Sequence, residues 1–129
     1  MTVAPPPPPL ASERGDPLAN TSRRIVQLHK EYYGKGPTRA RTYAQDDMIV
    51  VLLRGGFTRI EQTLVGEGRG NIVIAQRHAF QEIMRERFTM VVEEEFGRKV
   101  LAMMSSNHEA GEMSVEVFVL EPVAGEPGS

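Results

Sequence analysis

Cysteine and tryptophan are absent from this chain of 129 residues, and histidine occurs only three times. The lack of cysteine excludes disulfide bonds, thiol nucleophiles and zinc sites built from thiolates. The histidines at positions 29, 78 and 108 are scattered and lack the i,i+4 spacing of a helical metal site. We therefore predict neither a metal nor a cofactor.

Long hydrophobic runs are also missing. The longest apolar run, residues 48–53, is far too short to span a bilayer, and prolines occupy the place of a signal peptide's apolar segment. The formal net charge of −2 provides no overall positive field that would attract nucleic acid. We expect a soluble, cytoplasmic protein with no membrane span and no nucleic-acid partner.

The length corresponds to one domain. Pro5–Pro9 are consecutive prolines, which favour polyproline II and do not join a packed core. Residues 122–129 are polar and rich in glycine and proline. We expect disordered tails at 1–16 and 122–129 on either side of a single domain at 17–121. The alternative for the first tail is a proline-rich ligand of a recognition domain.

The longest helical pattern covers residues 71–96, with Asn71 as the expected N-cap and Gly97 as the C-cap. Glu82 and Arg85 have the spacing of an i,i+3 ion pair on its polar side. Its apolar arc is wider than one packing partner requires, which predicts a sheet on one flank and a helix or another subunit on the other. This arc contains Ile72, Val73, Ala79, Phe80, Ile83, Met84, Phe88, Met90 and Val91.

Two shorter helices are predicted. The first begins at Asp16-Pro17 or at Thr21-Ser22 and ends at Gly34. The second begins with the capping box formed by Thr58 and Glu61. Its expected core side consists of Ile60, Leu64 and Val65.

Alternating or continuous apolar residues predict strands at 38–44, 48–53, 98–106 and 113–121. The resulting order, α-β-β-α-α-β-β, predicts an α+β fold. We expect a two-layer sandwich of about four mainly antiparallel strands with the helices on one face. The apolar side chains left on the other face of the sheet predict a homodimer.

A basic cluster is the main feature that predicts binding. Lys35, Arg39, Arg41 and Arg54, with Lys30 nearby, fall in one supersecondary unit. Arginine on a strand can hold a carboxylate, a phosphate or bicarbonate, so we predict a small-anion or nucleotide site. The alternative is that these charges discourage pairing at a sheet edge. The glycines at 66–70 lack the lysine and spacing of a phosphate-binding loop.

His29 projects into the apolar face of the first helix. It is either a core histidine hydrogen-bonded to the backbone or a group that titrates near neutral pH. No partner group for a general base accompanies it, and no catalytic constellation is present elsewhere in the sequence. We therefore expect a protein that is not an enzyme.

Several blocks of the sequence, taken with their spacing, resemble the MpsC-like family, formerly a domain of unknown function. The resemblance extends over residues 21–121, nearly all of the expected domain. The matching blocks are residues 28–37, 53–58, 61–64, 97–100 and 118–121, together with Arg77 and Phe80.

The family name refers to a component of a cation-translocating, membrane-potential-generating system linked to bicarbonate uptake. The resemblance thus implies a small accessory protein of a transport system and not the transporter, with transporter subunits as its partners. It supplies no catalytic residues. The polar positions that it marks are His29, Lys35, Arg54, Arg77 and Arg98.

Overall fold

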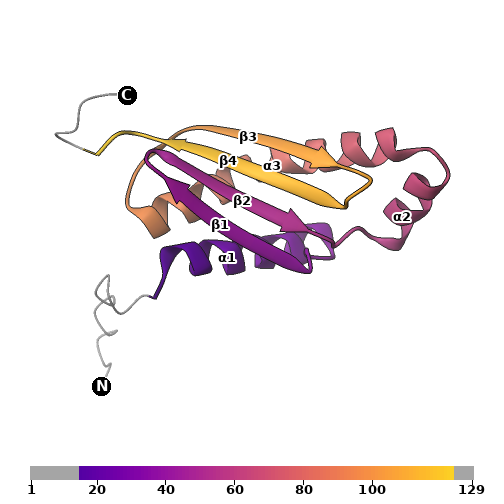
Figure 1. Cartoon of the computed structure of the whole chain (residues 1–129), viewed down its shortest axis with the longest axis horizontal. Coiled ribbons are helices and arrows are strands. Elements are labelled where there is room, and N and C mark those ends of the chain that lie inside the picture. The colour runs from indigo at the N-terminus through magenta and orange to yellow at the C-terminus, as the bar shows by residue number, and fades with distance from the viewer. Residues whose placement is uncertain (1–14, 124–129) are drawn as a thin grey trace, which may run out of the picture.

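The computed structural model describes residues 15–123 (Figure 1). Both expected tails, 1–16 and 122–129, lie almost entirely outside these residues. The order of elements agrees with the sequence prediction. The elements are α1 (Pro17–Tyr33), β1 (Arg39–Gln45), β2 (Met48–Arg54), α2 (Arg59–Gly66), α3 (Gly70–Phe96), β3 (Val100–His108) and β4 (Met113–Leu120).

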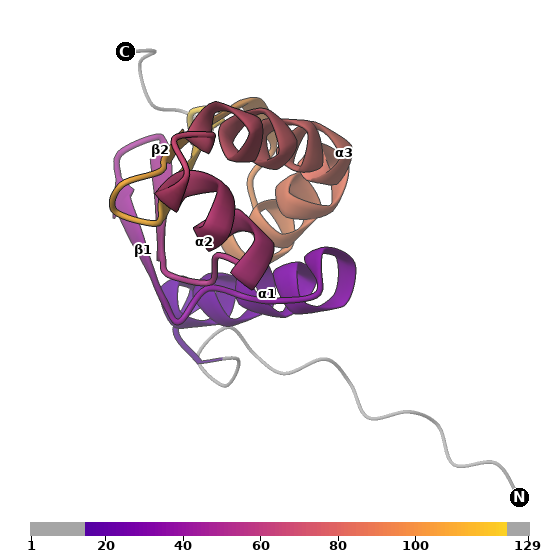
Figure 2. The same ribbon diagram turned by 90° about the vertical axis from the view of Figure 1, so that its right-hand side faces the viewer.

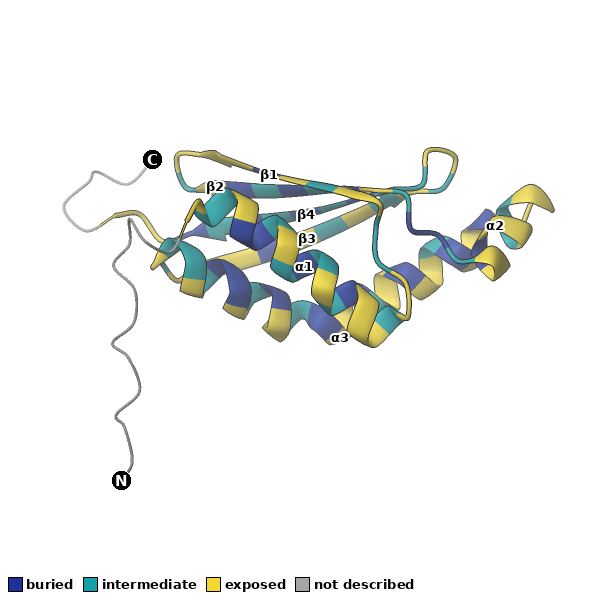
Figure 3. Cartoon of the chain, turned by 90° about the horizontal axis from the view of Figure 1, so that it is seen from below, coloured by how far each residue is buried: buried dark blue, intermediate teal, exposed yellow. Residues whose placement is uncertain are grey.

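The four strands form one antiparallel sheet in the order β1-β2-β4-β3. Each hairpin contributes two neighbouring strands, and β2 and β4 join the hairpins at the centre. Helices α1 and α3 pack against each other and against the same face of the sheet (Figure 3). The short helix α2 packs on α3, at the end of the molecule nearest the viewer in Figure 2. The predicted two-layer α+β fold is confirmed.

The core lies between the sheet and the two long helices. On β4, every second residue from Ser114 to Leu120 is buried against the helices, as strand geometry requires. Val115, Val117 and Val119 point to the other face and are half-buried. The apolar core consists of Ile25, Ile49, Val51, Leu53, Met84, Phe88, Val91, Val92, Met103, Phe118 and Leu120.

None of the described elements covers the opposite face of the sheet. Tyr43, Val50, Val117 and Met104 are successive register partners, so they form an apolar row across all four strands of this open face. Tyr43 is 49% exposed and Met104 is 54% exposed. The neighbouring rows are Gln45, Met48, Val119 and Ala102 on one side, and Arg41, Leu52, Val115 and Ser106 on the other.

Local capping signals gave mostly correct helix ends. Asp16 is the N-cap of α1, and its side chain accepts a hydrogen bond from Leu18 N at 2.9 Å. The capping box of α2 and the left-handed C-caps Gly34 and Gly97 are present as predicted. The N-cap predicted at Asn71 is wrong, because α3 already begins at Gly70 and its N-cap Arg69 makes no side-chain capping bond.

The predicted core faces of α2 and α3 are partly wrong. Ile60 is 73% exposed, and Glu61 is the buried residue of α2. On α3, Ile83 and Met90 are exposed, whereas Arg77 and Gln81 are buried. The apolar arc of α3 is wider than the sheet and α1 can cover together, so its outer margin stays in solvent.

The strand boundaries differ by one or two residues from the predicted ones, most at β3, which begins at Val100 instead of Arg98. The guanidinium of Arg98 instead bonds Asp47 and the Glu121 carbonyl, which ties together the turns at one end of the sheet. None of the three helices described by the structure combines the length and hydrophobicity that crossing a bilayer requires.

Candidate functional site

The structure brings together three of the four cations that were predicted to bind an anion. Arg39 and Arg54 are cross-strand register partners in β1 and β2, and Arg41 follows Arg39 on the same face of β1. Lys35 lies apart from them. Its ammonium donates a hydrogen bond to the carbonyl of Phe57 at 3.1 Å, so it links the loop after α1 to the segment before α2.

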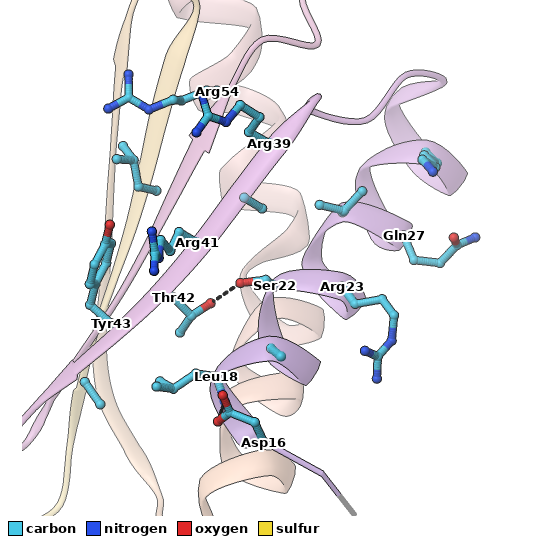
Figure 4. Close-up of a pocket in the computed structure, with 16 residues that line it drawn as sticks. Asp16, Leu18, Ser22, Arg23, Gln27, Arg39, Arg41, Thr42, Tyr43 and Arg54 are labelled. Atoms are coloured by element: carbon cyan, nitrogen blue, oxygen red, sulfur yellow. Dashed lines mark hydrogen bonds between the residues drawn. The ribbon is translucent and has the colours of Figure 1, made fainter.

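The three arginines border an open groove of about 1130 Å³ that runs between α1 and the outer edge of β1 (Figure 4). We call it the basic groove. Ser22 Oγ and Thr42 Oγ1, 2.8 Å apart, join α1 to β1 in the middle of the groove. Its walls are residues of α1 between Asp16 and Lys30, residues 39–44 of β1, and Leu52 and Arg54 of β2.

Two further cations line the groove from α1. Arg23 and Lys30 are seven residues apart, about two helical turns, and both line the groove. Lys30 was predicted as a neighbour of the cluster, whereas Arg23 was not predicted. The i,i+7 spacing was a usable signal, but only the packing of α1 along β1 makes these residues line the same groove as the strand arginines.

The groove carries an excess of positive charge. Within residues 15–123, Asp16 is its one carboxylate, and it lies at the end opposite Arg39 and Arg54 (Figure 4). None of the five cations of the groove belongs to an ion pair among these residues. By contrast, Arg24 and Arg98, which lie elsewhere, are both paired with carboxylates.

Three of the groove cations contact neutral groups. Arg54 Nη1 lies 3.3 Å from the Met113 sulfur, and the Arg41 guanidinium lies 5.9 Å from the Tyr43 ring centre. Arg23 donates to the amide oxygen of Asn20 at 2.6 Å. These contacts leave the positive charges uncompensated, so the groove is suited to carboxylate or phosphate groups. In the described part of the chain, no group of acidic residues and histidines is arranged to hold a metal ion.

His29 lies in the core and not in the groove. It is 3% exposed and stacks on Phe88 with ring centres 5.4 Å apart. Nδ1 lies 2.9 Å from the Ile25 carbonyl, which can only accept, so Nδ1 carries the proton. Burial lowers the pKa of His29 despite this bond, and the positive charge of Arg77 lowers it further. His29 is therefore a core histidine that is bonded to the backbone.

A second buried cluster was not predicted. Glu61 of α2 accepts from Arg77 Nε and Nη2 at 2.8 Å each and also accepts from the Tyr33 hydroxyl. Burial alone would raise the pKa of Glu61, but the bonds from Arg77 and Tyr33 hold it below 4.5. Burial and the bond to Glu61 raise the pKa of Tyr33 to about 12. The cluster joins the end of α1, the start of α2 and the first half of α3.

Glu116 is a third unexpected feature. It is fully buried on the helix side of β4, where it accepts from Gln81 Nε2 at 2.7 Å and from the Ser105 hydroxyl. No cation of the described chain forms an ion pair with it. Burial therefore raises its pKa to about 7 in spite of those two bonds. Asn107 continues the network through its reciprocal bonds with Gln81.

Comparison with known proteins identifies a matching protein family. Residues 14–122 match the family described as Na+-translocating membrane potential-generating system (MpsC). The chain is similar to the uncharacterized protein YrhF of Bacillus subtilis (strain 168), with 30% identity over 99 residues, which cover 75% of this chain and 81% of YrhF. The uncharacterized protein YbcI of the same organism is 31% identical over 67 residues, or 52% of this chain and 54% of YbcI. No solved structure matches the chain.

Proposed function

The chain belongs to the MpsC family, whose name refers to a Na+-translocating membrane potential-generating system, and on that premise we propose that it is a non-enzymatic accessory protein of such a system. In this proposal the protein is soluble and cytoplasmic, acts as a homodimer, and docks on a membrane subunit that transports cations or bicarbonate. The observation that carries the proposal is the open apolar face of the sheet.

The open face can supply a large part of a protein interface. Four strands about 4.8 Å apart and about seven residues long give a flat area of roughly 450 Å². Because side chains make the surface uneven, its accessible area is larger than this flat area. A standard interface buries roughly 800 Å² of accessible surface per partner. Val50, Val117 and Met104 occupy the centre of the face, with Arg39 and Arg54 at its border. An apolar centre with a charged border is typical of protein interfaces.

Light scattering after size-exclusion chromatography tests the dimer. We expect a dimer for the wild-type protein at micromolar concentration and a folded monomer for Val117→Lys, because the lysine would place a charge in the centre of the face. Ile83→Lys is the matched control, since Ile83 is 71% exposed on α3, away from the sheet, and should leave the dimer intact. A monomeric wild-type protein would contradict the dimer.

An affinity pull-down from gently solubilised membranes of the protein's own cells tests the accessory role. We expect a membrane transport subunit to be recovered with the tagged protein. Recovery of the tagged protein alone would count against this role.

A second function is favoured by the unpaired arginines of the basic groove. A module that senses a small anion or a nucleotide would bind it through Arg39, Arg41 and Arg54, while Lys35 has a separate contact. Thermal-shift screening against phosphate, bicarbonate and nucleotides tests this function. A thermal shift that persists in the Arg41→Ala/Arg54→Ala double variant would remove the groove from consideration.

The non-enzymatic part of the proposal has its own test. The only general base that the sequence suggested is His29, and its burial in the core counts against that role. A His29→Gln variant should retain full biological activity if its fold is preserved. Loss of activity in a variant that remains folded would contradict this part of the proposal.

A further inference from the structure

The outer edge of β1 is a second surface that lacks a partner. β1 is a terminal strand of the sheet, so one side of its backbone pairs with no strand of the described chain. This edge forms one wall of the basic groove. We propose that the β1 edge binds an extended acidic segment of a protein partner, which adds to the sheet as a further strand and lies in the basic groove. This inference rests on the proposed docking function and specifies the chemistry of the partner.

The backbone of β1 is suitable for strand addition. All of its residues, from Arg39 to Gln45, pair with β2 in one continuous register. The other sheet edge, β3, has a register shift between Val100 and Ala102, and such irregularities protect an edge from further pairing. An unpaired regular edge offers a row of N–H and C=O groups, which is how β-augmentation binds extended peptides. β1 is therefore the better of the two edges.

Cations flank this edge on both sides of the sheet plane. Arg39 and Arg41 lie on the open face of β1, whereas Arg23 and Lys30 line the groove from α1 on the helix side. In Figure 4 the Arg23 side chain points away from β1. Alternate side chains of an added strand point to opposite faces. Carboxylates on the open face would meet Arg39 and Arg41, and those on the other face would lie beside α1, which carries Arg23 and Lys30. The excess positive charge thus selects an acidic segment.

The same charges act against other occupants. Pairing of β1 with β1 of a second copy would add two more arginines to the same edge and supply no counter-charge, which is unfavourable. A neutral strand would leave the groove cations uncompensated. The charged edge thus prevents non-specific pairing, as edge strands commonly do, and remains open to a segment that neutralises it.

Synthetic peptides provide the test. The probe is a fluorescent peptide that alternates glutamate and valine, and a peptide that alternates glutamate and proline is the control. Both carry the same charge, but proline has no N–H and cannot complete a ladder. Binding is measured by fluorescence anisotropy, and the β1 amides are followed by hydrogen exchange. We expect the glutamate–valine peptide to bind more tightly and to slow the exchange of edge amides on β1.

Charge-reversal variants locate the site. Arg41→Glu should weaken binding of the glutamate–valine peptide about tenfold or more, since it replaces attraction by repulsion. Arg59→Glu makes the same change of charge at the start of α2, outside the groove, and should leave binding unchanged. Thermal melting confirms that both variants fold.

Any one of three results would overturn the inference. The glutamate–valine peptide does not bind the wild-type protein. The glutamate–proline peptide binds equally well and the β1 amides are not protected, or Arg41→Glu binds the glutamate–valine peptide with the wild-type affinity. If the membrane pull-down still recovers a transport subunit, the accessory function stands and the docking surface lies elsewhere. If the peptide binds but no subunit is recovered, the β1 edge stands and the accessory function fails.

Discussion

Arg77 of α3 and Glu61 of α2 form a two-pronged ion pair in the protein interior, with Nε–Oε2 and Nη2–Oε1 distances of 2.8 Å. The side chain of Arg77 is 8% exposed and that of Glu61 is 1% exposed. Arg77 also packs 4.1 Å from the Phe57 ring centre and donates to the Gly56 carbonyl at 3.1 Å. One guanidinium thus connects α3 to α2 and to the segment between β2 and α2.

Removal of this guanidinium should be costly. Arg77→Leu leaves the Glu61 carboxylate buried without a cation, and we expect a loss of about 3–5 kcal/mol in the free energy of unfolding. Urea denaturation measures the change. Arg85→Leu on the same helix is the control and should lose less, about 1–2 kcal/mol. Its ion pair with Glu82 is 43% and 50% exposed, and its other bond goes to the Met103 carbonyl at 2.8 Å. Equal losses in the two variants would contradict a special role for the buried pair.

Gly56 should tolerate no side chain. Its φ is +85°, and a Cβ there would lie 2.6 Å from both the Gly36 carbonyl oxygen and the Pro37 Cα. We expect Gly56→Ala to lose about 3 kcal/mol from backbone strain and overpacking together. Gly66→Ala is the matched control at the end of α2, where no atom lies within 4 Å of the new methyl group. It should be neutral or stabilise by up to about 1 kcal/mol in the same urea experiment.

Glu116 should make stability fall as pH rises. Its native pKa of about 7 exceeds its ordinary value of 4.5, so the folded state holds this proton more tightly than the unfolded chain does. The stabilisation is complete below about pH 4.5 and is lost as pH rises through 7, with a total on the order of 3 kcal/mol. The measurement is the free energy of unfolding of the wild type minus that of Glu116→Gln, as a function of pH.

Glu116→Gln is a suitable reference protein because its side chain does not titrate. The glutamine retains an acceptor for Gln81 and gains a donor for the Ser105 hydroxyl oxygen. Titrations of all other groups cancel in the difference between the two proteins. A difference that stays constant between about pH 4.5 and pH 8 would show that Glu116 is not protonated in this range.

The contribution of His29 to stability should change with pH in the opposite direction. Its pKa is lowered from 6.5, so the folded state resists protonation, and stabilisation by the neutral ring is present above pH 6.5. This stabilisation is lost as pH falls through the native pKa. Relative to His29→Leu, the wild-type protein should therefore become less stable on acidification. NMR titration of the imidazole gives an independent check, and a native pKa at or above 6.5 would contradict the expectation.

Sequence reasoning worked where the signal is local. The proline after Asp16, the capping box at Thr58 and Glu61, and the glycines after α1 and α3 each fix a helix end through the backbone of a few neighbouring residues. Strand alternation also revealed which residues of β4 share a face. It did not reveal which of the two faces meets the helices, because both carry apolar side chains.

Local sequence patterns were also insufficient for the candidate sites, where residues from distant segments meet. Arg39, Arg41 and Arg54 were predicted together because one hairpin brings them together. Arg23 was missed, since its place in the groove depends on how α1 packs along β1. The apolar arc of α3 suggested Ile83 as core, yet the buried stripe contains Arg77 and Gln81, whose partners come from other segments of the chain.

The sequence by itself thus determined the order of elements, most of the helix ends, the hairpins and the absence of thiol chemistry, because short-range backbone preferences and residue types decide these features. Only the tertiary structure decided that Glu61 meets Arg77 and that the β1 edge borders a basic groove. It also decided that Glu116 is buried and forms no ion pair with any cation of residues 15–123. Each of these depends on contacts between segments far apart in the chain. The free energy of these contacts depends on burial, and burial cannot be read from a local sequence pattern.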